Sequence, residues 1–339
     1  MPSIVLLTGA SGYIAKHIAL QLLQAGYHVR GTVRDLARGA EIRAALAPHV
    51  ADLDARLDFV QVDLTRDDGW TAALTGVDVL IHTASPFPIT QPDNADDLIR
   101  PAVDGTLRAL RAAHAAGVTR VIMTSSTAAI SGSALPSGDV SYDETNWTDP
   151  DDPTITAYTR SKTLAEMAAW KFIANEAPEL RLTVINPGFV VGAPLDARYG
   201  SSVGVIARIL RRKDPMLPNF GFAAVDVQDV AELHVRVIDQ PATHGQRIMA
   251  VDRFIWFTEM AQAIKAAYPV RRIVTRVAPD FIVRLLARFD PAVRTIVPSL
   301  GRQDRMDNSR AMATLRRGMR QVNKSVVATA AWLIDNKRA

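Results

Sequence analysis

The chain has 339 residues, of which 48% are hydrophobic and 22% charged, and it contains no cysteine. This composition is typical of a globular protein with a large core, and the lack of cysteine excludes disulfides, thiolate metal ligands and thiol catalysis. The seven histidines show no metal-ligand spacing, so we expect no metal site. We find no signal-peptide pattern and no apolar run of membrane-spanning length, and we therefore expect a cytoplasmic protein with no membrane partner.

The charge is unevenly distributed along the chain. The net charge is +4, but residues 271–339 carry 15 Lys and Arg against five Asp and Glu, a net charge of +10. These cations are scattered through apolar helical patterns, and few aromatic residues accompany them. We interpret them as solvated helix faces and expect no nucleic-acid partner.

The first predicted elements are a short apolar strand over residues 3–7 and a helix over residues 14–25. The turn between them reads Thr8-Gly9-Ala10-Ser11-Gly12-Tyr13-Ile14-Ala15. Gly9 permits a tight turn, Gly12 lets the backbone approach a pyrophosphate, and Ala15 is small enough for close packing of helix on strand. Free N–H groups at the helix N-terminus favour anions. The glycine spacing in this context predicts a dinucleotide-binding site.

A second strand is predicted over residues 28–34, and it ends where the ribose 2′ group of a dinucleotide is recognised. Arg34 at that position favours NADP, because a guanidinium suits a 2′-phosphate. Asp35, one position later, would suit NAD. We interpret Asp35 as the N-cap of a helix over residues 36–47 and predict NADP, with Arg38 as a further candidate phosphate contact.

Strand and helix patterns continue to alternate, which predicts an α/β fold: a Rossmann-type, doubly wound parallel sheet with helices on both faces. The further strands are expected at 57–62, 77–83, 119–125 and 181–187, and the further helices at 67–75, 95–116 and 157–176.

Beyond Gly192 the pattern is less regular. It predicts a short helix over 202–211, a helix from Val225 to about Ile238, a strand over 246–251 and a mostly helical remainder. We predict a dinucleotide-binding domain of residues 1–192 plus 222–255, and a smaller, mostly helical substrate-binding part of residues 193–221 plus 256–339.

Polar residues gather at the predicted carboxyl ends of the strands, where ligands bind in such sheets. Asp63 follows the third strand and has two open interpretations, a bond to the adenine amino group or a cap for the following turn. The long loop over residues 130–153 leads directly to Tyr158, and we expect it to form a wall of the active site. Residues 281–289 are apolar enough to cover a ligand, although we favour core packing for them.

Tyr158 and Lys162 lie four residues apart in a predicted helix, so their side chains share one face. An ammonium beside a phenol favours the phenolate, and we expect Lys162 to lower the pKa of Tyr158. Such a pair suits general acid–base chemistry on a carbonyl or hydroxyl group.

Taken together, these motifs resemble the extended short-chain dehydrogenase/reductase superfamily, and within it the branch of dihydroflavonol reductases, cinnamoyl-CoA reductases and carbonyl reductases. The resemblance is carried by T-G-A-S-G-Y-I-A at 8–15, T-V-R-D at 32–35, H-T-A-S-P at 82–86, T-S-S at 124–126, Y-T-R-S-K at 158–162 and N-P at 186–187.

The resemblance implies a catalytic triad of Ser126, Tyr158 and Lys162, with Ser125 as the alternative serine. Ser126 would hydrogen-bond the substrate oxygen, Tyr158 would deliver its proton, and Lys162 would hold the nicotinamide ribose. It also implies cofactor contacts at Gly9, Ser11, Gly12, Tyr13, Ile14, Arg34, Asp63, Leu64, Thr83, Ala84, Tyr158, Lys162, Pro187 and Val190.

The resulting hypothesis is an NADPH-dependent reductase of a small-molecule ketone or aldehyde with a bulky aromatic or apolar body, acting as a monomer or homodimer. Two positions differ from the plant enzymes of this branch. Ser131 replaces the Asn with which flavonoid reductases read the flavonoid ring, and Thr154-Ile155-Thr156-Ala157-Tyr158 replaces the N-W-Y-C-Y signature of cinnamoyl-CoA reductases. The alternatives are an NAD-dependent nucleotide-sugar epimerase or dehydratase and a non-catalytic NADP-binding module.

Overall fold

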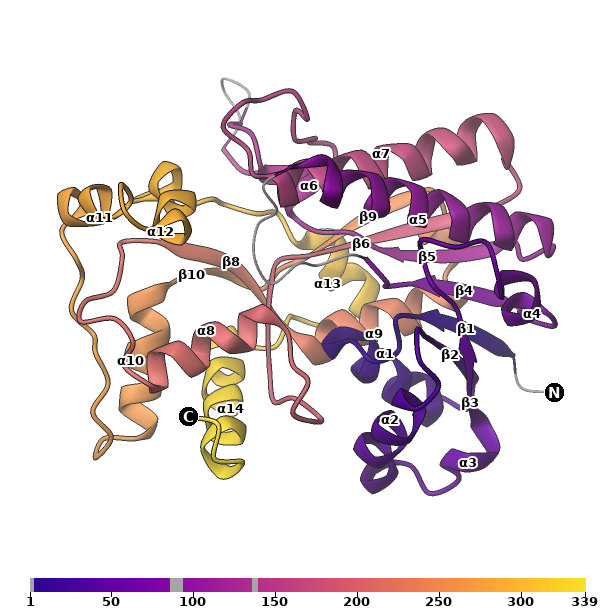
Figure 1. The fold of residues 1–339 in the computed structure, drawn as a ribbon, viewed down its shortest axis with the longest axis horizontal. Helices are drawn as coiled ribbons and strands as arrows, with labels where there is room; N and C mark the ends of the chain where they lie inside the picture. The colour runs from indigo at the N-terminus through magenta and orange to yellow at the C-terminus, as the bar shows by residue number, and fades with distance from the viewer. Residues whose placement is uncertain (1–2, 86–93, 136–139) are drawn as a thin grey trace.

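A large parallel sheet with its helices makes up the half of the molecule on the side of the N-terminus (right in Figure 1). The computed structural model describes residues 3–85, 94–135 and 140–339, so Pro86 and residues 136–139 of the predicted active-site loop lie outside the described residues. Within these ranges seven strands pair in the order β3-β2-β1-β4-β5-β6-β9. They are β1 (Ile4–Thr8), β2 (His28–Val33), β3 (Leu57–Gln61), β4 (Val79–His82), β5 (Arg120–Thr124), β6 (Arg181–Pro187) and β9 (Gln246–Ala250).

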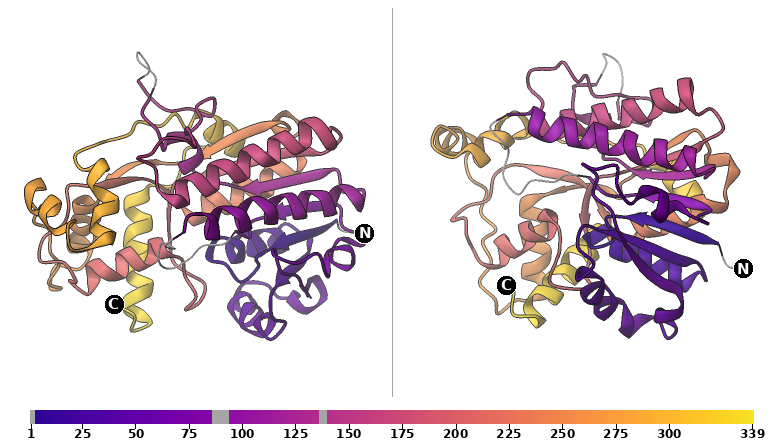
Figure 2. Two further views of the ribbon diagram at one scale, coloured as in Figure 1. Left: turned by 45° about the horizontal axis from the view of Figure 1, so that its top comes forward. Right: turned by 45° about the vertical axis from the view of Figure 1, so that its right-hand side comes forward.

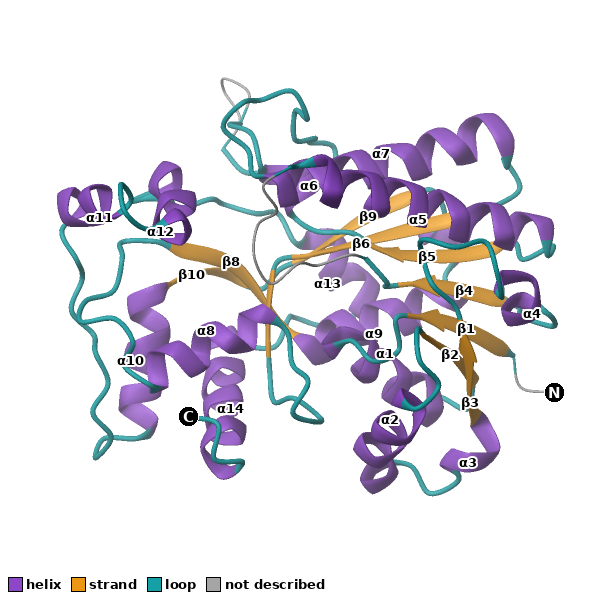
Figure 3. Ribbon diagram, viewed as in Figure 1, coloured by secondary structure: helices purple, strands orange, loops and turns teal. Residues whose placement is uncertain are grey.

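Helices cover both faces of this sheet (Figure 3). One face carries α5 (Asp96–Ala115) and α7 (Ala157–Glu176), which pack along each other, with the short α4 (Trp70–Leu74) and α6 (Ala128–Ser131) beside them. The other face carries α1 (Tyr13–Gln24), α9 (Val227–Arg236), α2 (Arg38–Leu46) and α3 (Leu53–Arg56). Because both faces are covered, the central strand β1 is almost entirely apolar, and its Val5, Leu6 and Leu7 are fully buried. The predicted Rossmann fold is confirmed.

The region around β2 contains one correction. Helix α2 begins at Arg38 with Ala37 as its N-cap, so the prediction that Asp35 caps this helix is wrong. The Asp35 carboxylate instead accepts the N–H of Ala37 at 3.0 Å, and its carbonyl accepts the N–H of Arg38. Asp35 thus stabilises a turn before the helix, an alternative that short acidic side chains commonly adopt.

A second sheet lies beside the first. Within the described residues it contains three strands in the order β10-β8-β7, namely β7 (Phe189–Val191), β8 (Gly221–Asp226) and β10 (Arg253–Trp256). The helices α8 (Ser201–Leu210), α10 (Phe257–Ala267) and α14 (Val322–Asp335) pack around it. The three strands come from, or from the edges of, the residues assigned above to the dinucleotide-binding domain, 1–192 and 222–255. The division of the chain into two functional parts stays a prediction.

Strand β8 overturns the prediction that Val225 opens a helix. Val225 and Asp226 are the last residues of β8, and α9 begins at Val227, where the Asp226 carboxylate accepts the N–H of Gln228 at 2.7 Å. The apolar run that precedes Asp226 is compatible with either structure, and pairing with β7 and β10 decides for a strand.

The remaining segments complete the C-terminal part. They are α11 (Asp280–Leu286), α12 (Pro291–Ile296), the 3-10 turn at Val297–Ser299 and α13 (Ser309–Leu315). Further 3-10 turns lie earlier in the chain, at Ala47–His49, Val237–Asp239 and Pro241–Thr243. In both views of Figure 2 the orange segment with α11 and α12 lies at the end of the molecule away from the N-terminus. Phe281 is 71% exposed and Phe289 is 81% exposed, so the core-packing interpretation of residues 281–289 is wrong for these side chains.

Candidate functional site

The glycine turn after β1 has the geometry that a phosphate cradle needs. Gly9 has a φ of +66°, and a Cβ at this position would lie 3.0 Å from the Cα of Ala84. The turn is closed by a bond from the Gly12 N–H to the Gly9 carbonyl at 2.9 Å, and Gly12 is the N-cap of α1 without any side-chain cap. The first N–H groups of α1 are therefore free of side-chain acceptors and available to an anion.

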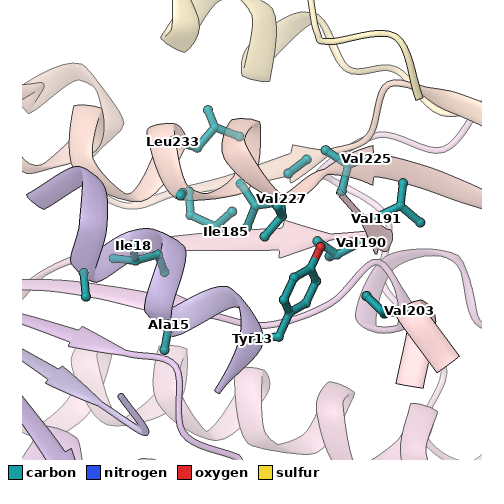
Figure 4. Packing of buried hydrophobic residues seen from close by; sticks show 14 of the residues in the cluster. Tyr13, Ala15, Ile18, Ile185, Val190, Val191, Val203, Val225, Val227 and Leu233 are labelled. Atoms are coloured by element: carbon teal, nitrogen blue, oxygen red, sulfur yellow. The ribbon is translucent and has the colours of Figure 1, made fainter. Parts of the chain in front are cut away.

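The side chain of Tyr13 is buried, whereas its neighbours Ser11 and Ile14 are half-buried. Its ring is buried beside Val190 and Val203, as Figure 4 shows, and its hydroxyl donates to the Gly192 carbonyl at 2.8 Å. Burial raises the pKa of the Tyr13 phenol, and the charge of Asp226 adds to that effect. The side chains of Tyr13 and Val190 thus join α1 to β7.

Two further predicted contacts, Thr83 and Ala84, lie directly beside the glycine turn. Thr8 Oγ1 accepts the N–H groups of Thr83 and Ala84 at 3.1 and 3.0 Å, and Thr83 Oγ1 donates to the Thr8 carbonyl. These bonds fix the end of β4 against the end of β1. Gly9, Thr83 and Ala84 therefore lie close together at the carboxyl edge of the sheet.

Arg34 and Asp63 come after the neighbouring strands β2 and β3. Arg34 is exposed just after β2, and its carbonyl accepts a bond from Gln61 of β3 at 3.0 Å. Asp63 accepts both the backbone N–H and the hydroxyl of Thr65 at 2.8 Å, so it does cap the following turn. These two bonds, with a smaller effect of the Arg34 charge, lower the pKa of Asp63. Leu64 is half-buried and lies close to Gly105 of α5, where an added Cβ would come within 3.1 Å of the Leu64 Cβ.

The predicted triad residues come together at the same edge of the sheet. Ser126 follows β5, and its side chain is hydrogen-bonded to that of Tyr158. Tyr158 lies in the first turn of α7, which begins after Thr156; the Thr156 hydroxyl accepts the N–H of Thr159 at 3.1 Å. Lys162 follows one turn later on the same helix. Pro187 ends β6 nearby, and its carbonyl accepts the N–H of Thr127 at 2.9 Å.

The pKa of Tyr158 differs from the expectation of the sequence analysis. Burial raises the pKa of Tyr158, and the hydrogen bond from Ser126 only partly offsets it, so the predicted lowering by Lys162 is not observed. Burial also lowers the pKa of Lys162 to about 8, against an opposing effect of Glu166. The physical reason for both shifts is desolvation, which disfavours the charged form of either group.

A buried polar cluster behind the triad was missed by the sequence analysis. Glu166 is fully buried, and its Oε2 accepts the Ser125 hydroxyl at 2.6 Å and the Asn186 side-chain amide at 2.7 Å. Its Oε1 accepts Arg247 Nε at 2.6 Å. The available signal was the i, i+4, i+8 spacing of Tyr158, Lys162 and Glu166, which places all three on one helix face. Since Ser125 bonds Glu166, it is Ser126 that meets Tyr158.

The described residues contain no group of three or more His, Asp and Glu side chains placed to hold a metal ion. Among those same residues, no helix is both long and apolar enough to cross a membrane.

Comparison with known proteins agrees with the fold and the motifs. Residues 5–251 match the model of the NAD dependent epimerase/dehydratase family. The chain is 33% identical to cinnamoyl-CoA reductase CAD2 of Medicago truncatula over 285 residues, which cover 82% of this chain and 85% of that protein. It is 34% identical to ketoreductase azaE of Aspergillus niger over 308 residues, covering 84% and 89%. The chain therefore belongs to the NAD dependent epimerase/dehydratase family, a family of extended short-chain dehydrogenases/reductases.

Solved structures show the same fold. Yeast methylglyoxal/isovaleraldehyde reductase Gre2, in complex with NADPH, superposes with a TM-score of 0.81 at 23% identity and covers 99% of this chain and 100% of its own. Gre2 of Candida albicans in complex with NADPH gives a TM-score of 0.81 at 26% identity, with 98% and 99% covered.

Proposed function

We propose that this protein is an NADPH-dependent reductase that converts a ketone or aldehyde to the alcohol. The observation that supports this most is the hydrogen bond between Ser126 and Tyr158 beside Lys162, at the same sheet edge as the Gly9 turn. The relatives at 33% and 34% identity are named as reductases, which agrees with this direction of chemistry.

The side chains suit proton delivery to a carbonyl oxygen. Bound NADPH would supply the hydride for the carbonyl carbon. Ser126 and Tyr158 would both hydrogen-bond the carbonyl oxygen and stabilise the negative charge that develops there. Tyr158 would then transfer its phenolic proton to that oxygen, while the Lys162 ammonium stabilises the phenolate that is left. A phenol whose pKa is raised by burial stays protonated at neutral pH and is available as the acid.

Two features support NADP over NAD. Arg34 is exposed at the position that meets the ribose 2′ group, where a cation suits the 2′-phosphate. The alternative carboxylate, Asp35, is held by the N–H of Ala37 at 3.0 Å.

The uncapped N-terminus of α1 and the close approach of Gly9 to Ala84 fit a pyrophosphate.

For the substrate we propose a ketone or aldehyde with an aromatic or apolar body. Ser131 and the segment 154–158 differ from the flavonoid and cinnamoyl-CoA reductases, which argues against a flavonoid or a CoA ester as the natural substrate. The cytoplasmic location, the division into two domains and the state as monomer or homodimer stay predictions.

The test follows NADPH absorbance with a panel of aryl ketones and aldehydes. In Tyr158→Phe we expect kcat to fall by about 10²–10⁴-fold, because the variant lacks the proton donor. Tyr27→Phe is the matched control: it also removes a phenol hydroxyl, but one that bonds Asp239 at 2.7 Å, outside the candidate site. Full activity of Tyr158→Phe, or an equal loss in both variants, would refute the role given to Tyr158.

The family match also admits an epimerase or dehydratase that retains NAD through each cycle. Denaturing the purified protein and identifying the released nucleotide separates the two functions. Retained NAD, together with no turnover of any carbonyl compound, would favour the epimerase or dehydratase. NADPH binding without turnover would instead identify a non-catalytic NADP-binding module.

A further inference from the structure

Glu166 is a buried carboxylate that the proposed chemistry does not use directly. Three side chains from different strands donate to it, Ser125 after β5, Asn186 of β6 and Arg247 of β9. Trp170 of α7 adds a fourth bond at 3.3 Å. A carboxylate with so many donors is held in one orientation.

The Arg247 guanidinium, which pairs with Glu166, is also held by several contacts. Its guanidinium lies 3.7 Å from the centroid of the Trp147 ring and donates to the carbonyls of Glu144 and Asn146 at 3.0 and 2.7 Å. The Arg247 side chain is 7% exposed and that of Glu166 is not exposed at all. The negative charge of Glu166 is therefore both localised and compensated from the side opposite α7.

Lys162 lies one helical turn before Glu166, at the i, i+4 spacing that makes two side chains neighbours. Burial disfavours the Lys162 ammonium, and Glu166 is the charged group that favours it. From β4, His82 also faces this site. Burial, with a smaller effect of Lys162, lowers the pKa of His82 to about 3, so His82 is neutral at pH 7 and offers no compensating charge.

The helices packed against α7 place their charges elsewhere. On α5, Arg108 bonds the Leu64 carbonyl and Asp67, and Arg111 lies over the Phe172 ring near the C-terminal end of α7. Helix α6 contains no charged residue. The other charged residues in the first half of α5, Asp96, Asp97, Arg100 and Asp104, are exposed. Glu166 is thus the buried carboxylate that favours the charged form of Lys162.

We propose that Glu166, locked in place by Ser125, Asn186 and Arg247, is a positioning residue that keeps the Lys162 side chain charged and directed beside Tyr158. Only the expected effect of Glu166 on turnover rests on the proposed reductase function. The charge of Lys162 can be measured without any substrate.

The direct test is competitive acetylation of the protein across pH 6–10, with peptide mass spectrometry reporting the titration of each lysine. In Glu166→Gln, which keeps the size of the side chain and removes its charge, we expect the Lys162 midpoint to fall by about one pH unit. Lys171, exposed on the same helix, is the internal standard and should titrate alike in both proteins.

Two further variants control for structural damage. Glu232→Gln removes a carboxylate that is likewise held by arginines, Arg236 at 2.8 Å and Arg317, but on α9. It should leave the Lys162 midpoint unchanged. Because Glu166→Gln leaves Arg247 unpaired in the interior, the double variant Glu166→Gln/Arg247→Gln removes both charges. Its Lys162 midpoint should fall between those of the wild type and the single variant.

The pH profile of kcat gives the functional consequence. We expect activity to be lost on the alkaline side about one pH unit earlier in Glu166→Gln than in the wild type. An unchanged Lys162 midpoint in both the single and the double variant would overturn the proposal. A shifted midpoint in a protein that reduces no carbonyl compound would leave the proposal standing and refute the proposed function.

Discussion

The large parallel sheet and the small three-stranded sheet share one apolar core, but polar contacts play an additional role where the C-terminal segment packs. Around the large sheet, strands and helices pack through apolar faces. The same apolar cluster includes Ile255, Met260 and Leu333 around the small sheet. The C-terminal segment is also joined to the rest of the chain by polar contacts: Asp229 of α9 bonds Arg317 and Arg320, and Asp252 accepts the N–H of Val322 at 2.9 Å.

The largest effect is expected where one buried charge carries several of these contacts. Asp229 is fully buried and accepts Arg317 at 2.7 Å, the backbone N–H of Arg320 at 2.6 Å and the Arg320 guanidinium. In Asp229→Asn both cations lose their buried partner, and we expect the free energy of unfolding to fall by about 3 kcal/mol. Urea denaturation followed by circular dichroism measures this change.

Asp67→Asn is the matched control in the large region. Asp67 also pairs with an arginine, Arg108, but its side chain is 88% exposed, and solvent screening limits such a pair to about 0–1 kcal/mol. Equal losses in the two variants would mean that the polar contacts of Asp229 do not stabilise the packing of the C-terminal segment.

Elements that depend on local sequence patterns could be predicted, whereas those that depend on contacts with distant segments could not. The boundaries of β1, α1, β2, α5 and α7 follow from apolar periodicity and from turn residues such as Gly26, which has a φ of +91° after α1. Strand β8 was missed because its run of small and apolar residues fits a helix equally well, and only β7 and β10 select the strand.

The candidate site shows the same limit. Tyr158 and Lys162 stand out because four residues separate them on one helix. The partners of Glu166 could not be predicted, since Ser125, Asn186 and Arg247 are 41, 20 and 81 residues away in the chain. The raised pKa of Tyr158 could not be predicted either, because it arises from burial of the side chain in the folded protein.

Acid should weaken the large region by an intermediate amount through its buried histidines. His234 bonds Thr124 at 2.7 Å, and burial lowers its pKa to about 4 from an ordinary value of 6.5. Between these pH values the unfolded chain takes up a proton that the folded chain does not, so stability is lost as the pH falls from 6.5 towards 4. Between pH 7 and pH 5, His234→Gln should lose about 2 kcal/mol less of its unfolding free energy than the wild type. Equal losses would show that His234 is protonated in the folded protein.

The smallest effect is expected at the exposed apolar face of α11 and the residues that follow it. Phe289 is 81% exposed, so Phe289→Ala removes little buried surface and should change the free energy of unfolding by less than about 0.5 kcal/mol. Phe172 on α7 is the matched control: it is 3% exposed beneath Arg111 and beside His114, and Phe172→Ala should cost about 3–5 kcal/mol. Urea denaturation of both variants tests the contrast. A loss at Phe289 comparable to that at Phe172 would mean that the phenyl ring of Phe289 is covered in solution, and the region around α11 would then resemble the large sheet in depending on apolar burial.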